Sequence, residues 1–284
     1  MRIGDVRIDP LIDGELVVPG STFYQGTTEA DWLAYDRFLE PVFHEATHLN
    51  TLGGYLLRWA DRVVVVDCGI GPSPTPPFVG GGFRSALSAL GVARAEVTDV
   101  ILTHLHFDHL GWASVDGRPF FPEATYRLDR RDWDYYCAPD FEMTELEASY
   151  CDPEKDAPKR RLAPVEDRIE FFVGEQEILP GLNALEVAGH TPGETAVEIV
   201  SAGEKGLLLG DVVHAQPELI DDQPVEKWCF LNNHDQEAAN AAVERIRRRV
   251  ADERIPFAAA HFAGLRWARI ELDRGRRTWV DIPV

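Results

Sequence analysis

Three histidines and an aspartate lie within the six positions 104–109 of the sequence. They follow an apolar run at residues 100–102, and they are His104, His106, Asp108 and His109. The spacing is too tight for one face of a helix and favours a loop that wraps around metal. Imidazole and carboxylate ligands without a thiolate suit Zn²⁺ and related divalent ions. Such a loop can serve two adjacent metals, the first two histidines binding one and Asp108 with His109 binding the other.

Three further polar residues repeat this arrangement, each directly after an apolar run. His190 follows LEVAG, Asp211 follows GLLLG, and His261 follows FAAA. Taken alone, each of them would more often be a buried core or turn residue. Together with the segment 104–109 they indicate a larger ligand set, because strands that end side by side can deliver their next residues to one site.

A second candidate metal motif is HEATH, His44 to His48, which matches the H-E-x-x-H pattern of zinc proteases. The pattern requires a helix that places both histidines on one face. The segment instead runs directly into Gly53 and Gly54 and then into strand-like sequence, and Thr51 and Gly54 stand where the extended pattern requires Gly and His. We therefore expect HEATH to be an incidental match in a loop, with neither histidine binding metal.

Short apolar runs bounded by glycine and proline predict strands, and longer amphipathic runs predict helices. The predicted strands are residues 6–12, 55–59, 62–69, 97–104, 124–129, 182–190, 195–201, 206–214, 256–262 and 267–273. The predicted helices are residues 29–40, 83–91, 129–136 and 235–253. Residues 71–82, rich in glycine and proline, predict a surface loop that could cover a site. The pattern indicates sheets covered by helices.

Composition and charge limit the kinds of partner. The 284-residue chain has 48 Asp and Glu against 28 Lys and Arg, a net charge of −20, which repels nucleic-acid backbones and anionic membranes. Its four cysteines show no C-x-x-C spacing, which favours free thiols in a reducing compartment. No signal-peptide core and no run of about 18 apolar residues occurs. We expect a cytoplasmic protein that binds neither nucleic acid nor membrane.

The set His104-x-His106-x-Asp108-His109, followed by His190, Asp211 and His261, resembles the signature of the metallo-β-lactamase-fold hydrolase superfamily. The resemblance extends from about residue 55 to residue 265. It implies an α/β fold, a four-layer αβ/βα sandwich of two mixed β-sheets flanked by helices. With 45% hydrophobic residues the chain can bury one large core, so we expect residues 1–284 to form a single domain.

The resemblance also implies a role for each matching residue. The first metal would be bound by His104, His106 and His190, and the second by Asp108, His109 and His261. Asp211 would bridge both metals. Asp67, which follows an early strand, would support the metal-binding loop as an acceptor for a histidine ring N–H, although a simple turn-capping role stays open. The segment HTPGE, residues 190–194, is similar to the family's fourth motif.

Departures from the pattern narrow the choice of relatives. Zinc β-lactamases lack the bridging aspartate, so Asp211 disfavours antibiotic hydrolysis as the native role. Flavodiiron relatives carry glutamate where this chain has His106, which disfavours redox chemistry. Acyl-homoserine lactonases usually have tyrosine three residues after the bridging aspartate, where this chain has His214. A histidine at this position resembles the branch of the superfamily that contains methyl-parathion-hydrolase-type enzymes. His214 would either contact the substrate or have a packing role alone.

These features together predict an enzyme, a dinuclear metal-dependent hydrolase with two divalent ions, zinc being expected and manganese or iron staying open. A metal-bridging hydroxide would attack the substrate, since metal ions lower the pKa of bound water from 15.7 toward about 7. Asp108 and His214 are the candidate catalytic residues. We expect a small lactone or ester as substrate, with a phosphotriester as the nearest alternative. An RNA-processing nuclease of the same superfamily is disfavoured by the negative charge, and a non-catalytic relative would be expected to lose ligands.

Two points stay open from the sequence. A homodimer is compatible with it. The aromatic residues that flank the motifs could line an apolar substrate pocket or belong to the core. They are Trp112, Trp133, Tyr135, Tyr136, Trp228, Phe230, Phe262 and Trp267.

Overall fold

The strand β5, Arg62–Val66, shows how the apolar runs build the fold. Side chains alternate between the two faces of a strand, so a run that is apolar at every position is buried on both faces. Val63 and Val65 pack with the cluster that includes Phe83 and Leu87. Val64 and Val66 face the opposite way and pack with residues of a second sheet. β5 therefore lies between a helical layer and another sheet.

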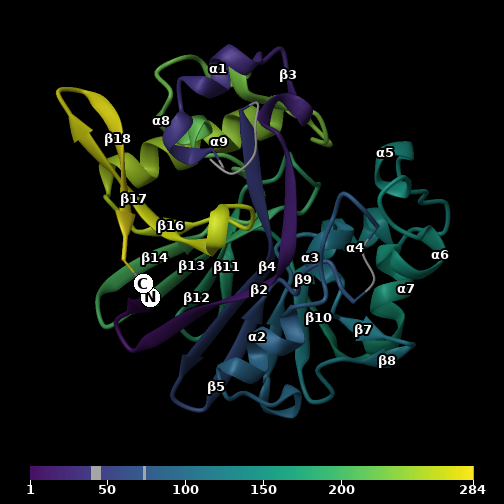
Figure 1. The fold of residues 1–284 in the computed structure, drawn as a ribbon. Coiled ribbons are helices and arrows are strands. Elements are labelled where there is room, and N and C mark those ends of the chain that lie inside the picture. The colour runs from purple at the N-terminus through teal and green to yellow at the C-terminus, as the bar shows by residue number, and fades with distance from the viewer. Residues whose placement is uncertain (40–45, 73–74, 284) are drawn as a thin grey trace.

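The computed structural model describes residues 1–39, 46–72 and 75–283, and it contains two large sheets (Figure 1). The first has the order β1-β2-β4-β5-β6-β9-β10. Its strands are β1 Arg2–Ile3, β2 Val6–Pro19, β4 Thr47–Trp59, β5, β6 Asp99–Ile101, β9 Thr125–Asp129 and β10 Ile169–Phe172. β5, β6, β9 and β10 are parallel, whereas β2 and β4 pair antiparallel, so the sheet is mixed.

The second sheet has the order β11-β12-β13-β14-β16-β17-β18. Its strands are β11 Gln176–Leu179, β12 Leu182–Glu186, β13 Thr195–Ser201, β14 Glu204–Leu208, β16 Phe257–Ala258, β17 Trp267–Asp273 and β18 Arg276–Ile282. Only β14 and β16 pair in parallel. Two small pairs complete the strands: β3 Tyr24–Gln25 with β15 Cys229–Phe230, and β7 Ser114–Val115 with β8 Arg118–Pro119.

Helices cover the outer faces of both sheets (Figure 1). They are α1 Glu29–Leu33, α2 Phe83–Ala89, α3 Phe107–Leu110, α4 Arg130–Tyr136, α5 Glu145–Ala148, α6 Pro153–Asp156, α7 Pro158–Leu162, α8 Pro217–Ile220 and α9 Gln236–Asp252. α2 packs through Phe83 and Leu87 on the first sheet, and α9 packs through Ala242, Ile246 and Val250 on the second. None of the helices within the described ranges is long and apolar enough to cross a membrane.

The two sheets share a core that contains residues of both. Ile8 and Leu57 of the first sheet pack with Val197, Leu208 and other residues of the second. The order of layers is therefore helices, sheet, sheet, helices. The predicted architecture, a four-layer sandwich of two mixed sheets flanked by helices, is confirmed.

Local structure differs from the sequence-based prediction at the N-terminal helix. The helix expected over residues 29–40 ends at Leu33 and is followed by a short 3₁₀ turn, Asp36–Phe38. Trp32 is buried against Tyr24 and Trp228, and Tyr35 also contacts Trp228. The helix thus ends between two residues that both pack on Trp228, namely Trp32 and Tyr35. Tertiary contacts of this kind override a helical pattern in the sequence. Residue 40 lies outside the described residues.

Gly53 and Gly54 mark a close approach of backbones rather than a break. Both lie inside β4, so the strand predicted to start at residue 55 starts earlier, at Thr47. A Cβ on Gly53 would lie 2.2 Å from the carbonyl oxygen of Leu11, and one on Gly54 would lie 1.9 Å from that of Asp67. Glycine inside a strand often marks such a site. The absence of side chains at Gly53 and Gly54 therefore lets the backbones of Leu11 and Asp67 pack closely against β4.

Asp13 fixes the segments that follow β5. It is buried in β2, beside a register shift in the β2–β4 pairing between Ile12 and Gly14. Its carboxylate accepts hydrogen bonds at 2.9 Å from four backbone N–H groups, which belong to Ile70, Gly71, Gly81 and Phe83. One side chain thus holds the turn after β5 and the start of α2.

We expect Asp13→Ala to lower the free energy of unfolding by about 3 kcal/mol or more, because buried N–H groups would lose their acceptor. Denaturant unfolding followed by circular dichroism measures this loss. Asp61→Ala, at an exposed aspartate in the turn between β4 and β5, is the control and should change the value by less than about 0.5 kcal/mol. Equal stability of the two variants would refute this role of Asp13.

Candidate metal centre

The side chains predicted to bind metal meet at one edge of the two sheets. His104 follows β6 in the first sheet, and Asp211 and His261 follow β14 and β16 in the second. β14 and β16 are parallel, so both strands end at the same edge. β12, which precedes His190, is antiparallel to β13, as β14 is, so it ends there too. Ligands in open sheets commonly bind at such carboxyl ends.

The segment 104–109 is partly loop and partly helix. His106 occupies the N-cap position of the one-turn helix α3 without a capping hydrogen bond from its side chain, and α3 contains Asp108 and His109. The expectation of a loop throughout is therefore wrong for Phe107–Leu110. Adjacent helical residues point in different directions, so His109 turns inward toward Asp67 while Asp108 faces a cavity.

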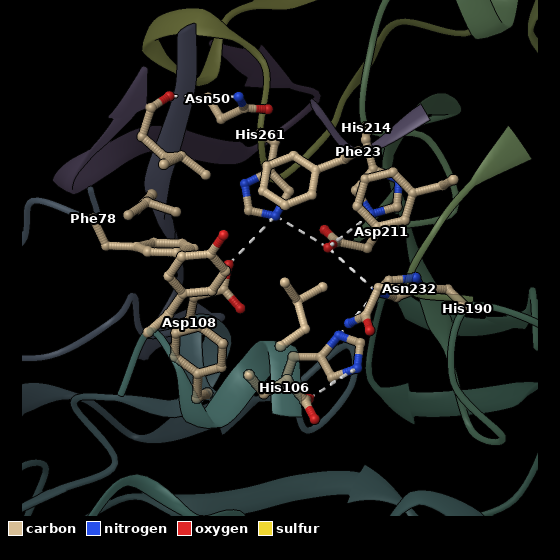
Figure 2. A pocket seen from close by; sticks show the side chains of 17 residues that line it. Phe23, Asn50, Phe78, His106, Asp108, His190, Asp211, His214, Asn232 and His261 are labelled. Atoms are coloured by element: carbon tan, nitrogen blue, oxygen red, sulfur yellow. Dashed lines mark hydrogen bonds and ion pairs between the residues drawn. The ribbon is translucent and has the colours of Figure 1, made fainter. Parts of the chain in front are cut away.

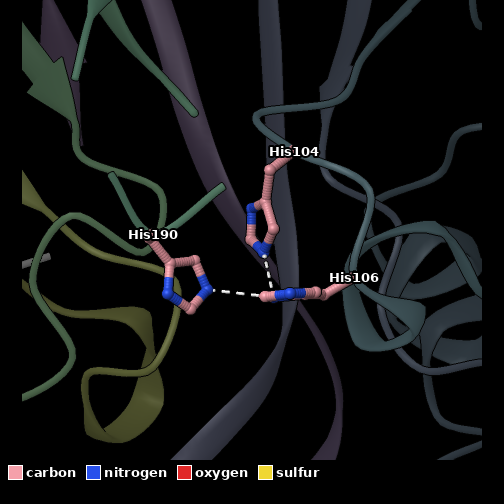
Figure 3. Close-up of side chains that lie close together, drawn as sticks. All are labelled: His104, His106 and His190. Carbon is pink, nitrogen blue, oxygen red and sulfur yellow. Dashed lines mark hydrogen bonds between the residues drawn. The ribbon is translucent and has the colours of Figure 1, made fainter. Parts of the chain in front are cut away.

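Three imidazoles converge in a first cluster (Figure 3). Nε2 of His104 lies 3.1 Å from Nδ1 of His106, and Nε2 of His190 lies 2.9 Å from the same atom. All three side chains are buried. Three nitrogens that point toward one another can be bound by a single cation, which is the arrangement of ligands in a tetrahedral zinc site with one open position.

A second cluster lies beside the first and contains Asp108, His109 and His261. Oδ2 of Asp108 is 3.8 Å from Nε2 of His109 and 3.6 Å from Nε2 of His261. The side chain of Asp108 is 13% exposed, more than either histidine, because it faces the cavity. Among the described residues four overlapping groups could hold a metal ion, and these two clusters have the same members as the two ligand sets expected from the sequence. The other two groups both contain Asp211.

Asp211 lies between the clusters. Its Oδ2 is 3.5 Å from Nε2 of His190 in the first cluster, and 3.4 Å and 3.0 Å from Nε2 of His109 and His261 in the second. Its other oxygen, Oδ1, is buried and has no hydrogen-bond partner among the described residues, and the same holds for Nε2 of His109. Buried polar atoms are rarely left unpaired. Divalent cations would satisfy these atoms, so the residues fit a dinuclear metal site.

The histidine nitrogens that point away from the clusters have partners of their own. They are Asp67 Oδ2 for His109 at 3.1 Å, the Thr103 hydroxyl for His104 at 3.1 Å, Asn233 Oδ1 for His190 at 3.0 Å, the Thr51 carbonyl for His261 at 3.2 Å and the Tyr136 hydroxyl for His106 at 2.9 Å. Oε2 of Glu194 also lies 3.1 Å from Nδ1 of His104. Such contacts fix the ring orientation of a metal ligand. The sequence predicts this role for Asp67 alone. Glu194 belongs to the motif HTPGE, and Tyr136 is one of the aromatic residues that flank the motifs.

Burial and charge set the protonation states in the clusters. Burial lowers the pKa of His104 and of His190 well below the ordinary value, so both rings are neutral, as metal binding requires. Burial alone would also lower the pKa of His109, but Asp211, Asp108 and Asp67 raise it well above its usual value. Burial would raise the pKa of Asp211, yet His261, His109 and His214 hold it well below. The centre thus has an ionised carboxylate among imidazoles.

His214 packs against Phe230 and also lines the cavity. Its Nε2 lies 3.2 Å from Oδ2 of Asp211, and the residue lines the same cavity as Asp108. Its ring also stacks on Phe230, with centroids 3.6 Å apart and planes inclined by 12°. Glu218 accepts hydrogen bonds from the backbone N–H groups of His214 and Ala215 and from the Tyr24 hydroxyl. Packing therefore fixes a ring that also faces the site.

An apolar cavity of about 80 Å³ opens beside the clusters (Figure 2). Its apolar lining residues are Leu16, Phe23, Leu52, Phe78, Phe107, Leu146, Tyr150 and Phe230. Phe78 belongs to the predicted loop 71–82, and its ring packs on those of Phe107 and Tyr150 at centroid distances of 5.5 and 5.1 Å. The loop residues described, 71–72 and 75–82, thus reach the site through Phe78.

The flanking aromatic residues divide between cavity and core. Phe230 lines this cavity, and Tyr135 and Tyr136 line a neighbouring one. Trp112, Phe262 and Trp267 are buried in three separate core clusters. Trp228 belongs to the aromatic cluster around Trp32, and Trp133 is half-buried against Phe171.

The HEATH segment is not helical where it is described. His44 lies outside the described residues, whereas His48 lies in β4 and not in the expected loop. Nε2 of His48 is 3.3 Å from the side-chain oxygen of Gln216, and its ring contacts Trp32. Burial lowers the pKa of His48 to about 4, so the ring is neutral. His48 belongs to none of the clusters that could bind metal in the described part of the chain.

We expect His48→Gln to leave the metal content of the purified protein unchanged, because glutamine can still contact Gln216 and no metal-binding side chain is lost. Plasma mass spectrometry of the variant and the wild type measures this. His261→Gln is the matched substitution at a proposed ligand and should lower the content. Loss of a full equivalent of metal from His48→Gln would contradict the assignment.

Comparison with known proteins agrees with this geometry. A family model described as the metallo-beta-lactamase superfamily matches residues 54–258. An N-acyl homoserine lactonase AttM from Azorhizobium caulinodans is 40% identical over 60 residues, which cover 21% of this chain and 21% of that protein. The aligned part thus spans about a fifth of the length of the curated relative.

Three solved structures share the fold over the whole chain. The dizinc quorum-quenching lactonase AidC has a TM-score of 0.82 at 20% identity and is covered over 97% of its length. The hydrolase AbOPH has a TM-score of 0.80 at 22% identity and 96% coverage. A probable metal-dependent hydrolase from Staphylococcus aureus has a TM-score of 0.77 at 18% identity and 99% coverage. All three are described as hydrolases, the class that the sequence predicts, and two of them as dizinc or metal-dependent. Because the family model spans more than half of the chain, the chain belongs to the metallo-beta-lactamase superfamily.

Proposed function

We propose that this chain is a dinuclear metal-dependent hydrolase that cleaves a small lactone or ester, with zinc as the resident metal. The observation that carries the proposal is the position of Asp211, whose Oδ2 lies within 3.5 Å of histidines from both clusters. The first metal would be held by His104, His106 and His190, and the second by Asp108, His109 and His261, with Asp211 between them. When bound, two such ions supply a hydroxide nucleophile from water near neutral pH and withdraw charge from the substrate.

The protein side chains would then perform the remaining tasks. Asp108 is a carboxylate that lines the cavity beside the second cluster, so it can accept a proton at Oδ2 and pass it to the departing oxygen. His214, fixed on Phe230, faces the same space from the side of Asp211 and would contact the reacting group of the substrate. The apolar residues that line the cavity would exclude water and hold an acyl group.

The charge of the cavity favours an uncharged substrate over a nucleic acid. Among the described residues no lysine or arginine lines it, whereas Asp108, Glu147 and Asp211 do. Apart from the proposed metal ions, a phosphodiester backbone would find no basic side chain there to pair with its further phosphates. A phosphotriester is uncharged, so it is the second candidate substrate class.

Two further expectations concern location and domain organisation. The four cysteines are free, which supports a reducing location such as the cytoplasm. The core shared by both sheets supports a single domain over residues 1–284.

The test is a panel of lactones, aryl esters and phosphotriesters assayed with metal-loaded protein. We expect measurable turnover of at least one lactone or carboxylic ester, with slower turnover of phosphotriesters. Asp211→Asn protein, purified in the same way, controls for contaminating hydrolases and should be inactive. Turnover of phosphotriesters alone would move the assignment to that class. No turnover of any class by protein with two metals per chain would refute the proposed hydrolysis.

A further inference from the structure

A second cavity adjoins the metal centre on the side of His106 and His190. Its volume is about 230 Å³. It shares four lining residues with the apolar cavity, namely His106, Glu147, His190 and Asn232. The two cavities therefore meet at the first metal cluster. A substrate whose reacting bond lies at the metals can extend one part into each cavity.

Aromatic rings form much of the wall of the second cavity. Tyr135 meets Tyr136 at a centroid distance of 4.9 Å and an interplanar angle of 85°, and meets His234 at 4.8 Å and 74°. Phe141 lies 5.1 Å from Tyr136 and 5.7 Å from Tyr135. Rings inclined this steeply can form adjoining walls of one space. Aromatic walls of this kind attract organic cations through the negative faces of the rings.

Glu147 supplies a buried carboxylate at the junction of the cavities. The residue is only 5% exposed. Its Oε2 accepts hydrogen bonds from the backbone N–H and the hydroxyl of Thr144 in a capping box at the start of α5. Its Oε1 accepts no hydrogen bond among the described residues, and lies 3.8 Å from Nε2 of His106, which already has the Tyr136 hydroxyl at 2.9 Å. Glu147 lines the second cavity, so a cation or a hydrogen-bond donor bound there could pair with Oε1.

Apart from the proposed metal ions, the charged groups of the second cavity are acidic. Its described lining residues include Glu142 and Glu147 but no lysine or arginine. An anionic group would find no lysine or arginine beside Glu147, and a neutral apolar group would leave Oε1 of Glu147 unpaired. A substituted ammonium group satisfies both the carboxylate and the aromatic faces.

We propose that the second cavity is a subsite for an organic cation, and that the enzyme cleaves esters of amino alcohols with a substituted ammonium group. This inference rests on the proposed hydrolytic function. The acyl group would lie in the apolar cavity and the ammonium group between Glu147, Tyr135 and Phe141. Hydrolysis breaks the acyl carbon–oxygen bond, transfers the oxygen of water to the acyl carbon, and releases a carboxylate, a proton and the amino alcohol.

Two esters with the same acyl group test the subsite directly. Butyrylcholine carries a trimethylammonium group, and 3,3-dimethylbutyl butyrate carries an uncharged group of the same shape. We expect kcat/KM to be roughly 10-fold or more higher for the choline ester, because a desolvated cation gains both ring and carboxylate contacts. Equal values, or a preference for the neutral ester, would overturn the proposal.

Two variants of residues that line the cavity, and one control variant, test where the preference arises. Glu147→Gln keeps the shape of the side chain, and glutamine also serves in a capping box, so α5 should form. The ratio of the two kcat/KM values should fall toward 1 in this variant. Glu145→Gln removes the same charge from an exposed position of the same helix and should keep the ratio. Tyr135→Leu, at a half-exposed ring, should lower the ratio independently of Glu147. A ratio unchanged in both Glu147→Gln and Tyr135→Leu would refute the assignment of the subsite.

Binding of choline without turnover separates this inference from the proposed function. Isothermal titration of the wild type with choline, and with 3,3-dimethylbutanol as the neutral control, should show binding of choline alone, weakened in Glu147→Gln. Choline binding without hydrolysis of any ester would support the subsite and contradict the proposed hydrolysis. Hydrolysis of neutral esters without choline binding would support the hydrolysis and overturn the subsite.

Discussion

Asp108→Asn should lower turnover of the best substrate by about 100-fold or more, even in protein that retains two metals per chain. Asp108 is a proposed ligand that lines the cavity, its side chain is more exposed than that of His109, and we propose that its carboxylate takes a proton beside the reacting bond. Asparagine has nearly the same shape but cannot accept that proton. Losses of about 10²–10⁴ are typical when a general acid–base group is removed.

Metal occupancy must be separated from proton transfer in this experiment. The variant is assayed with metal in excess, after metal analysis confirms occupancy and circular dichroism confirms the fold. Asp116→Asn, at an exposed turn between β7 and β8, is the same substitution away from the cavity and should keep normal turnover. Near-normal turnover of Asp108→Asn under these conditions would make Asp108 a replaceable ligand. The proton route would then have to use Asp211, His214 or solvent.

Asp211→Asn should have the larger effect on the metals, lowering their number from two per chain to one or fewer and abolishing detectable turnover. Oδ2 of Asp211 lies within 3.5 Å of His109, His190 and His261, so one carboxylate serves both clusters. Losing a residue that only orients a ligand typically costs about 10–100-fold in metal affinity or activity. Asn233→Ala removes the hydrogen-bond partner of His190 and is the comparison variant. We expect it to lower metal affinity less than Asp211→Asn does. Retention of two metals in Asp211→Asn would contradict the bridging role.

The positions of the candidate ligands were predictable because their sequence signals are local. The spacing at 104–109 needs only one strand end to present several donors. His190, Asp211 and His261 each follow an apolar run, and strands that run in the same direction end at one edge. The chemistry of the donors then indicates two metals without knowledge of the sheet order.

Other features depend on contacts between distant segments, and the sequence does not encode these in a local pattern. Tyr136 and Asn233 contact His106 and His190 only because α4 and the segment before α9 pack on the same edge of the fold. The sequence also does not predict that β4 continues through Gly53 and Gly54, because glycine usually indicates the end of a strand or helix. Residues of α4, α5 and the segment 231–234 line the second cavity together, so no single sequence motif predicts it.

The number of metal ions bound per chain tests the central claim most directly. Protein expressed with supplementary zinc, purified without chelators and analysed by plasma mass spectrometry should contain about two divalent ions per chain, because the clusters around Asp211 provide two sets of buried donors. X-ray absorption at the metal edge should show nitrogen and oxygen ligands without sulfur. A content near zero after metal-supplemented expression, in protein shown to be folded, would contradict the account.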